Sequence, residues 1–116
     1  MNMPSWIDNY VSIPYMEVNC WGLVVLIYKE MYGLDLTDKE DQGELIREGF
    51  WIEVKDDVRT GDVILFKRDK GAHVGLLIDA NYMIHADEVC GSVIERWTAR
   101  NWIHSVNGIY RCKQIA

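Results

Sequence analysis

The strongest constraint on the fold is an apolar segment at residues 20–32, which opens with a cysteine and has no charged residue before Lys29. Its large apolar side chains recur every three or four positions, which is the spacing of one helix face. They are Leu23, Val24, Ile27, Tyr28 and Met31. Gly33 follows where a left-handed C-terminal cap is expected. We therefore expect a buried helix that begins near Cys20 and ends near Tyr32.

Cys20 lies at the predicted N-terminus of this helix. Unpaired backbone amides and the helix dipole favour negative charge at that end, and the thiolate is the nucleophilic form of cysteine. Free cysteine is also among the most buried residue types. The position of Cys20 is therefore compatible with both a nucleophile and a packed core thiol.

Length and composition favour one domain that spans residues 1–116, because 49% hydrophobic residues are enough for one packed core. The three cysteines, Cys20, Cys90 and Cys112, include no CxxC pair, which favours neither a disulfide framework nor a zinc ribbon. The formal net charge is −6, and the acidic residues concentrate between positions 35 and 48. This charge argues against a nucleic-acid partner, which would require clustered Lys and Arg.

The N-terminal sequence "MNMPSWIDNY" has no basic start followed by an apolar run. No later segment approaches the length of a membrane span. We therefore expect synthesis in the cytoplasm without a signal peptide, and no membrane insertion.

A second, amphipathic helix is predicted at residues 37–50. Thr37 followed by Glu40 matches a capping box, in which each side chain bonds the backbone amide of the other residue. Leu45 and Ile46 are expected to face inward.

Beyond this helix the chain changes to short apolar runs separated by turn residues, which is typical of antiparallel strands. The runs lie at residues 63–67, 72–78, 82–86, 92–97 and 107–112, with a short helix or loop at 98–103. This order predicts an α+β fold, in which the N-terminal buried helix packs on a mainly antiparallel sheet of about five strands.

The apolar runs on either side of residues 79–81 predict a β-hairpin that brings two histidines together. Counting outward from this loop puts Gly75 opposite His85. His73 and His85 then share a face as diagonal neighbours, roughly 7 to 8 Å apart at the backbone, a separation that long polar side chains can bridge. Gly75 has no side chain, so we expect the start of the helix, with Cys20, to approach there.

Cys20, His73 and His85 together point to chemistry more strongly than any one of them does. A thiolate needs a cationic neighbour, and a catalytic base needs a third group to orient it. A metal site built from the same three residues is an alternative, although their spacing is unlike any familiar ligand pattern. We expect neither a metal nor an organic cofactor, and His104 is interpreted as structural or exposed.

Short motifs along nearly the whole chain, from Trp6 to Arg111, point to a family. They are "IPY", "NCWGLV", "GDVILF", "HVGLLIDANYMIHA" and "NGIYR". In combination they resemble the NlpC-type papain-like cysteine peptidases, especially the short versions associated with bacteriophage tails. The resemblance implies a papain-like core with Cys20 as nucleophile, His73 as general base and acid, and His85 as the residue that orients His73.

The resemblance also implies substrate-binding roles for Tyr15, Asn19 and Trp21. Tyr15 falls where similar enzymes place a tyrosine near the substrate. Asn19 stands where the family usually carries Asp, and Trp21 stands where many members have Ser. In similar enzymes the acid faces the substrate, so Asn19 is expected to alter substrate preference more than the chemistry.

Hydrolysis of a peptide in the bacterial cell wall is the activity that the resemblance implies. The bond would join the γ-carboxyl of D-glutamate to diaminopimelate or lysine, so peptidoglycan stem peptides are the expected substrate. Phage tail proteins are candidate partners, and the virion tail is a candidate location. Two alternatives stay open. One is an intracellular papain-like amidase or acyltransferase acting on another γ-glutamyl or acyl substrate, and the other is an inactive structural tail domain.

Overall fold

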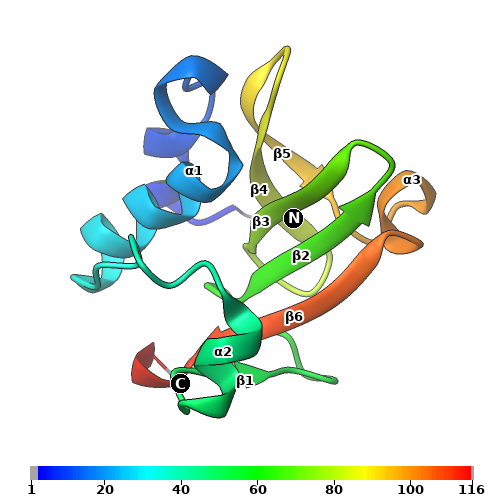
Figure 1. Cartoon of the computed structure of the whole chain (residues 1–116). Helices are drawn as coiled ribbons and strands as arrows, with labels where there is room; N and C mark the ends of the chain where they lie inside the picture. Colours follow the sequence, from blue (N-terminus) through cyan, green and yellow to red (C-terminus); the bar gives the residue numbers. More distant parts are fainter. Residues whose placement is uncertain (1–2, 116) are drawn as a thin grey trace.

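The computed structural model describes residues 3–115, in which helices pack on one antiparallel sheet (Figure 1). The helical elements are η1 (Ser5–Tyr10), α1 (Tyr15–Tyr32), α2 (Gln42–Arg47), α3 (Arg100–Ile103) and η2 (Lys113–Ile115). The strands are β1 (Trp51–Glu53), β2 (Val63–Arg68), β3 (Gly71–Leu77), β4 (Tyr82–Asp87), β5 (Gly91–Arg96) and β6 (Val106–Cys112). They are ordered β1-β6-β2-β3-β4-β5.

The α+β prediction is confirmed, and the sheet has six strands instead of about five. The strand that was not predicted is β1, which pairs with β6. Only one of its three residues is buried, so it is too short to show an alternating pattern. The short helix or loop predicted at 98–103 contains α3.

Helix α1 is interrupted at Asn19, whose φ of 49° and ψ of −176° separate a first turn from the long helix that follows. The Asn19 side-chain oxygen accepts a hydrogen bond from the Gly22 amide at 2.8 Å, so Asn19 is the N-cap of the long helix. Gly33, with φ of 66°, ends the helix. The predicted limits near Cys20 and Tyr32 are confirmed, whereas the extra turn at 15–18 was not predicted.

The capping box predicted for the second helix is wrong. Asp41 caps α2 instead, because its side chain accepts a hydrogen bond from the Glu44 amide at 3.0 Å. The Thr37 hydroxyl donates to Asp35 at 2.6 Å, so a local turn uses the group that the capping box required. Helix α2 is therefore shorter than predicted. Its inward-facing apolar residues are Leu45, which is buried, and Ile46, which is partly buried.

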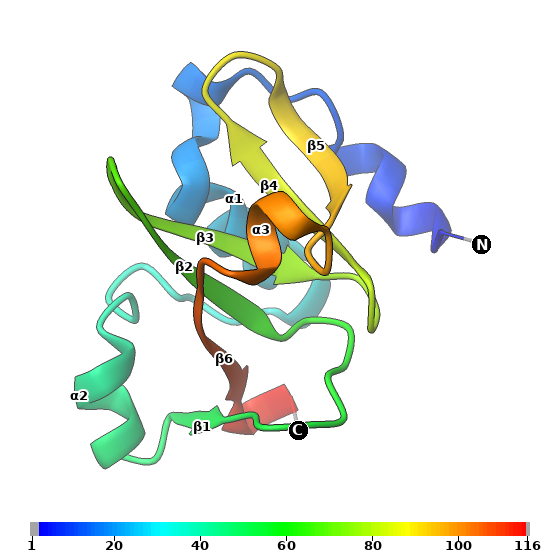
Figure 2. The ribbon, with the colours of Figure 1, turned by 90° about the vertical axis from the view of Figure 1, so that its right-hand side faces the viewer.

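Both faces of the sheet are covered in the β3–β4 region, with α1 and α3 on opposite sides (Figure 2). On one face, apolar residues of α1 pack against alternate residues of β3 and β4. They are Leu23, Val24 and Ile27 of α1 and Val74, Leu76, Ile84 and Ala86 of the strands. The other face carries a second cluster around Phe66, Met83 and Trp102. Met31, predicted on the buried face of α1, is 39% exposed.

The prediction that the helix approaches the sheet over Gly75 is wrong. A side chain at Gly75 would meet Met83, Ile64 and the Cβ atom of His85, so this space belongs to the second cluster. Side chains alternate along a strand, and the body of α1 packs on the opposite face. Cys20 must therefore reach the histidines at an end of the strands.

A buried ion pair joins two of the sequence motifs. Asp62 of "GDVILF" is 1% exposed, and Arg111 of "NGIYR" donates from Nε to its Oδ1 at 2.9 Å. A second Arg111 nitrogen donates to Oδ2 at the same distance. Removing one partner from such a pair leaves an uncompensated buried charge. These two motif residues therefore have a structural role, tying the start of β2 to β6.

No helix in residues 3–115 meets the length and hydropathy needed to cross a bilayer.

Candidate active site

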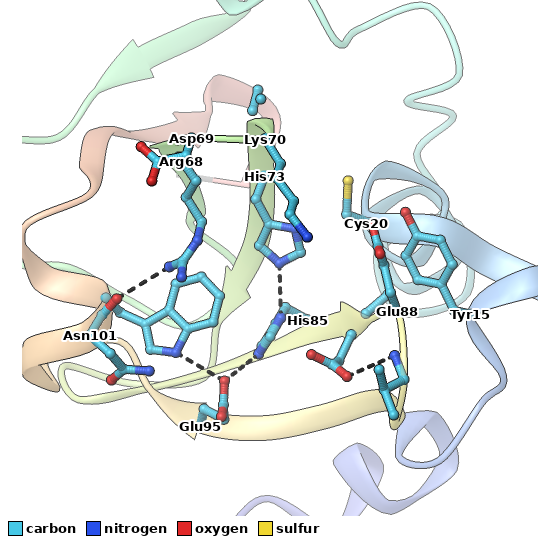
Figure 3. Close-up of a pocket in the computed structure, with 16 residues that line it drawn as sticks. Tyr15, Cys20, Arg68, Asp69, Lys70, His73, His85, Glu88, Glu95 and Asn101 are labelled. Atoms are coloured by element: carbon cyan, nitrogen blue, oxygen red, sulfur yellow. Dashed lines mark hydrogen bonds and ion pairs between the residues drawn. The ribbon is translucent and has the colours of Figure 1, made fainter.

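A cavity of about 620 Å³ brings together the three residues predicted to be catalytic (Figure 3). Cys20 comes from the start of the long helix, His73 from β3 and His85 from β4. Strands β3 and β4 pair only near their shared turn, at Leu76–Ile84 and Leu77–Met83. Toward the cavity the paired ladder is absent, and Cys20 lines the same cavity as the histidines at this separated end.

The segment before α1 is fastened to β5, which positions the turn that carries Cys20. The backbone of Ser12 and Ile13 bonds to the backbone of Ser92 at 2.8 and 2.9 Å. The Ile13 amide also donates to the Ser92 hydroxyl at 2.8 Å. A side chain at Gly91 would collide with the Ile13 carbonyl oxygen, so the close approach requires glycine there.

The two histidines are in direct contact, as the hairpin register predicted. Nε2 of His73 lies 2.9 Å from Nδ1 of His85, and the rings are nearly perpendicular. His85 is 1% exposed, whereas His73 is half-buried. This contact leaves Nδ1 of His73 for another partner, and Figure 3 shows Cys20 beside the His73 ring. No hydrogen bond joins Cys20 to His73 in the described chain, and such contacts often tighten only with substrate.

Glu95 and Trp102 extend this chain of polar contacts, and sequence reasoning missed both. Nε2 of His85 lies 2.7 Å from Oε2 of Glu95, and the Trp102 indole donates to the same oxygen at 3.0 Å. The signal for Glu95 was present in "SVIERW". Counting the β4–β5 register places Val93 opposite His85, which makes Glu95 its diagonal neighbour on the same face.

Aromatic rings pack around His73. Trp102 stacks on it with ring centroids 5.6 Å apart, and the Arg68 guanidinium lies 4.2 Å from the Trp102 ring. The pKa of His73 is lowered to about 4, mainly by burial and to a smaller extent by the neighbouring His85 and Arg68. His73 is therefore neutral at neutral pH, which suits a proton acceptor. The sequence had instead suggested a cation beside the thiolate.

The residues predicted to bind substrate lie in different surroundings. Tyr15 lines the cavity; burial raises the pKa of its phenol, as do Cys20 and Glu88. Asn19 and Trp21 are not among the cavity residues. Asn19 caps the helix, and Trp21 packs against the core with no hydrogen-bond partner for its buried indole nitrogen within residues 3–115. Substrate-binding roles for these three residues stay predictions.

Charged side chains of both signs line the cavity. Arg68 and Lys70 come from β2 and the turn after it, with Asp69 between them. Asp87 and Glu88 come from the end of β4 and the turn after it.

Within the described chain, no group of three or more His, Cys, Asp or Glu side chains is arranged to hold a metal ion. All three cysteines are free thiols, and Cys90 and His104 are exposed.

Comparison with known proteins identifies the family. The family described as NlpC/P60 matches residues 8–111. The chain belongs to the NlpC/P60 family. This confirms the family resemblance found in the sequence. The comparisons do not test association with phage tails, which stays a prediction.

An Escherichia coli K12 protein named Murein DD-endopeptidase MepS/Murein LD-carboxypeptidase is 28% identical over 90 residues. The match covers 73% of this chain and 44% of that protein. The present chain therefore spans less than half the length of this relative.

Solved structures of the NlpC/P60 family share the fold. A Bacillus cereus family protein superposes with a TM-score of 0.70 at 23% identity, covering 96% of this chain and 41% of that chain. A Staphylococcus aureus Mu50 protein, described as similar to lipoprotein, gives 0.69 at 22% identity, covering 90% and 38%. The NlpC/p60 domain of the peptidoglycan hydrolase SagA gives 0.63 at 19% identity, covering 90% and 91%.

Proposed function

We propose that this NlpC/P60 domain is a cysteine peptidase that hydrolyses peptidoglycan stem peptides. The observation that carries the proposal is the cavity that Cys20, at a helix start, lines together with the contacting pair His73 and His85. A helix start, a neighbouring base and a group that orients the base are the parts that an activated thiol requires. The name of the Escherichia coli relative, a murein endopeptidase, supports the same substrate class.

In the proposed reaction, neutral His73 accepts the thiol proton of Cys20 as the sulfur attacks the carbonyl carbon. Backbone amides at the helix start, including that of Cys20, stabilise the oxyanion. The Gly22 amide is already bound to Asn19, so this role falls to amides nearer the thiol. His73 then gives its proton to the leaving amine. Water, deprotonated by His73, releases the acid from the thioester and restores the thiol.

The bond that we propose lies between the γ-carboxyl of D-glutamate and diaminopimelate or lysine. The mixed charge of the cavity supports a stem peptide, which carries both carboxylates and amines. Arg68 and Lys70 complement the carboxylates, and Asp87 and Glu88 complement an amine. The Escherichia coli relative is named for DD-endopeptidase and LD-carboxypeptidase activities, so an assay has to resolve which bond is cut.

Digestion of purified peptidoglycan, with products identified by mass spectrometry, tests reaction, substrate and bond together. We expect fragments that end in γ-D-glutamate from the wild-type domain and none from Cys20→Ala. Cleavage of soluble γ-glutamyl or acyl substrates, with intact wall peptides, would favour the amidase or acyltransferase alternative. Inactivity on both substrate classes would favour a structural role.

We also propose that the domain is part of a phage tail and cleaves wall peptides from there. The resemblance of "NCWGLV" to the short tail-associated versions supports this location. Mass spectrometry of purified virions from a host carrying the parent gene should detect the domain in the tail fraction. Its absence from virions, with the protein abundant in uninfected cells, would refute tail association without affecting the proposed chemistry.

A further inference from the structure

We propose that Glu95 is a positioning residue that determines which nitrogen of each histidine carries the proton, so that His73 presents a bare nitrogen to Cys20. The catalytic consequence rests on the proposed peptidase function, whereas the placement of the protons does not. The inference follows from the order of contacts from Trp102 to Glu95, His85 and His73.

The first step concerns the Glu95 oxygen that bonds His85. An ionised carboxylate accepts hydrogen bonds and donates none, and an indole nitrogen only donates. Trp102 donates to Oε2 at 3.0 Å, and Nε2 of His85 lies 2.7 Å from the same atom. Nε2 of His85 must therefore carry a proton. In neutral His85 the other nitrogen, Nδ1, is then bare.

The second step passes this assignment to His73. The bare Nδ1 of His85 lies 2.9 Å from Nε2 of His73, so it can only accept a hydrogen bond. Nε2 of His73 must carry the proton, and Nδ1 of neutral His73 is left bare. A bare nitrogen is what His73 needs in order to accept a proton from the thiol. The lowered pKa of His73, caused mainly by burial, agrees with a neutral ring.

The third step considers the same pair without the carboxylate. His85 is then free to protonate on Nδ1 and to donate to Nε2 of His73. His73 would then carry its proton on Nδ1, toward Cys20, and that nitrogen would have no lone pair with which to accept the thiol proton. His85 is only 1% exposed, so bulk water has little access to set its tautomer. Glu95 therefore selects the competent arrangement of two that the histidines alone allow.

Nitrogen-15 NMR of the whole labelled chain tests the inference directly, because protonated and bare imidazole nitrogens have different shifts. In the wild type we expect protons on Nε2 of both His73 and His85. Glu95→Leu should move part of the His73 population to the Nδ1 proton. Glu95→Gln keeps an accepting oxygen for His85 and Trp102, so it should retain most of the wild-type tautomer.

Kinetics on a stem peptide give a second readout. We expect Glu95→Leu to lower kcat by roughly ten- to hundredfold with little change in KM, the range seen for outer carboxylates that orient metal-bound imidazoles. Glu95→Gln should recover part of this loss. Glu53→Leu is the matched control, because the Glu53 side chain lies on the same sheet and is 43% exposed, as is that of Glu95, but pairs with Lys55. It should alter neither readout.

The wild-type spectrum alone can overturn the inference, even if Glu95→Leu fails to fold. A His73 proton on Nδ1 in the wild type would refute it, as would unchanged tautomers in folded Glu95→Leu. If the wild type shows the expected tautomers and Glu95→Leu shifts them, but no wall peptide is cleaved, the inference holds and the proposed function fails. If wall peptides are cleaved but wild-type His73 carries its proton on Nδ1, the proposed function holds and the inference fails.

Discussion

Two polar networks on the same sheet differ in whether their last groups have partners. In the Asp62–Arg111 pair, two guanidinium nitrogens bond the two carboxylate oxygens, and the Arg59 amide adds a third hydrogen bond. The chain from Glu95 through His85 to His73 also has short contacts, but it ends at a cavity. There, the described residues offer no hydrogen bond to Nδ1 of His73.

We expect one network to contribute to the stability of the fold and the other to contribute to catalysis. In the closed network both oxygens of the buried carboxylate have partners and neither residue lines the cavity, so we expect it to hold elements together. A chain with an unused nitrogen at a cavity can exchange a proton with a substrate or nucleophile. Changes in the closed network should therefore affect unfolding, and changes in the open chain should affect turnover.

Removal of the thiol should have the largest effect. Cys20→Ala is expected to abolish hydrolysis of wall peptides and to leave the unfolding midpoint nearly unchanged, because the residue lies at the cavity and is only partly buried. Cys90→Ala is the control, since Cys90 is exposed and should keep most of the activity. Turnover by Cys20→Ala would refute the proposed mechanism.

The histidines should differ in the size of their effects. His73→Ala should lower kcat/KM by roughly 10²- to 10⁴-fold, the usual contribution of a general base or acid. His85→Ala should cost less, because it removes only orientation. His85→Gln should recover part of the loss, because its amide can accept from His73 and donate to Glu95. Equal losses for all His85 variants would show that His85 has another role.

The closed network should show the opposite pattern. Arg111→Met leaves Asp62 buried without its charged partner, which should lower the free energy of unfolding by about 3 to 5 kcal/mol. Urea denaturation measures this change. The folded fraction should retain its kcat, because neither residue lines the cavity. A selective loss of kcat with unchanged stability would contradict the division between the two networks.

The contacts from Glu95 through His85 to His73 should also make stability depend on pH, through the titration of His73. The pKa of His73 is about 4 in the folded chain, against 6.5 for an unperturbed histidine. The unfolded chain therefore binds more protons between these values, so the contribution of His73 to stability is present above pH 6.5 and falls as pH drops toward 4. His73→Gln should flatten the stability profile in this window. An unchanged slope would show that His73 titrates normally.

Much of the site could be predicted from the sequence because it depends on local geometry. The helix start at Cys20 and the hairpin register through His73 and His85 each follow from spacing within one or two elements. Glu95 required a second hairpin register, which the same counting could have supplied. Trp102 required the docking of α3 on the sheet, and no local pattern encodes that contact.

The error at Gly75 has a similar cause. Period-two alternation places residues on a face, but it does not say which face a helix covers. The space over Gly75 is filled by Met83 and Ile64, and helix α1 packs on the opposite face of the sheet. Asn19 was likewise interpreted by the carboxylate that it lacks relative to Asp, whereas in the structure its side chain caps the helix. Both outcomes depend on tertiary contacts or side-chain geometry that spacing does not determine.

The smallest expected effect concerns Asn19, which precedes Cys20 in the sequence and caps the long helix. Asn19→Ala removes the hydrogen bond to the Gly22 amide and should cost about 0.5 to 2 kcal/mol of stability. Asn19→Asp can keep that bond, and Asp tolerates the positive φ about as well, so stability should change little. The added carboxylate repels a neighbouring thiolate, so alkylation of Cys20 should require higher pH in Asn19→Asp and not in Asn19→Ala. Identical alkylation profiles in both variants would mean that a charge at position 19 is screened from the thiol. The absence of Asp there would then have no consequence for the nucleophile.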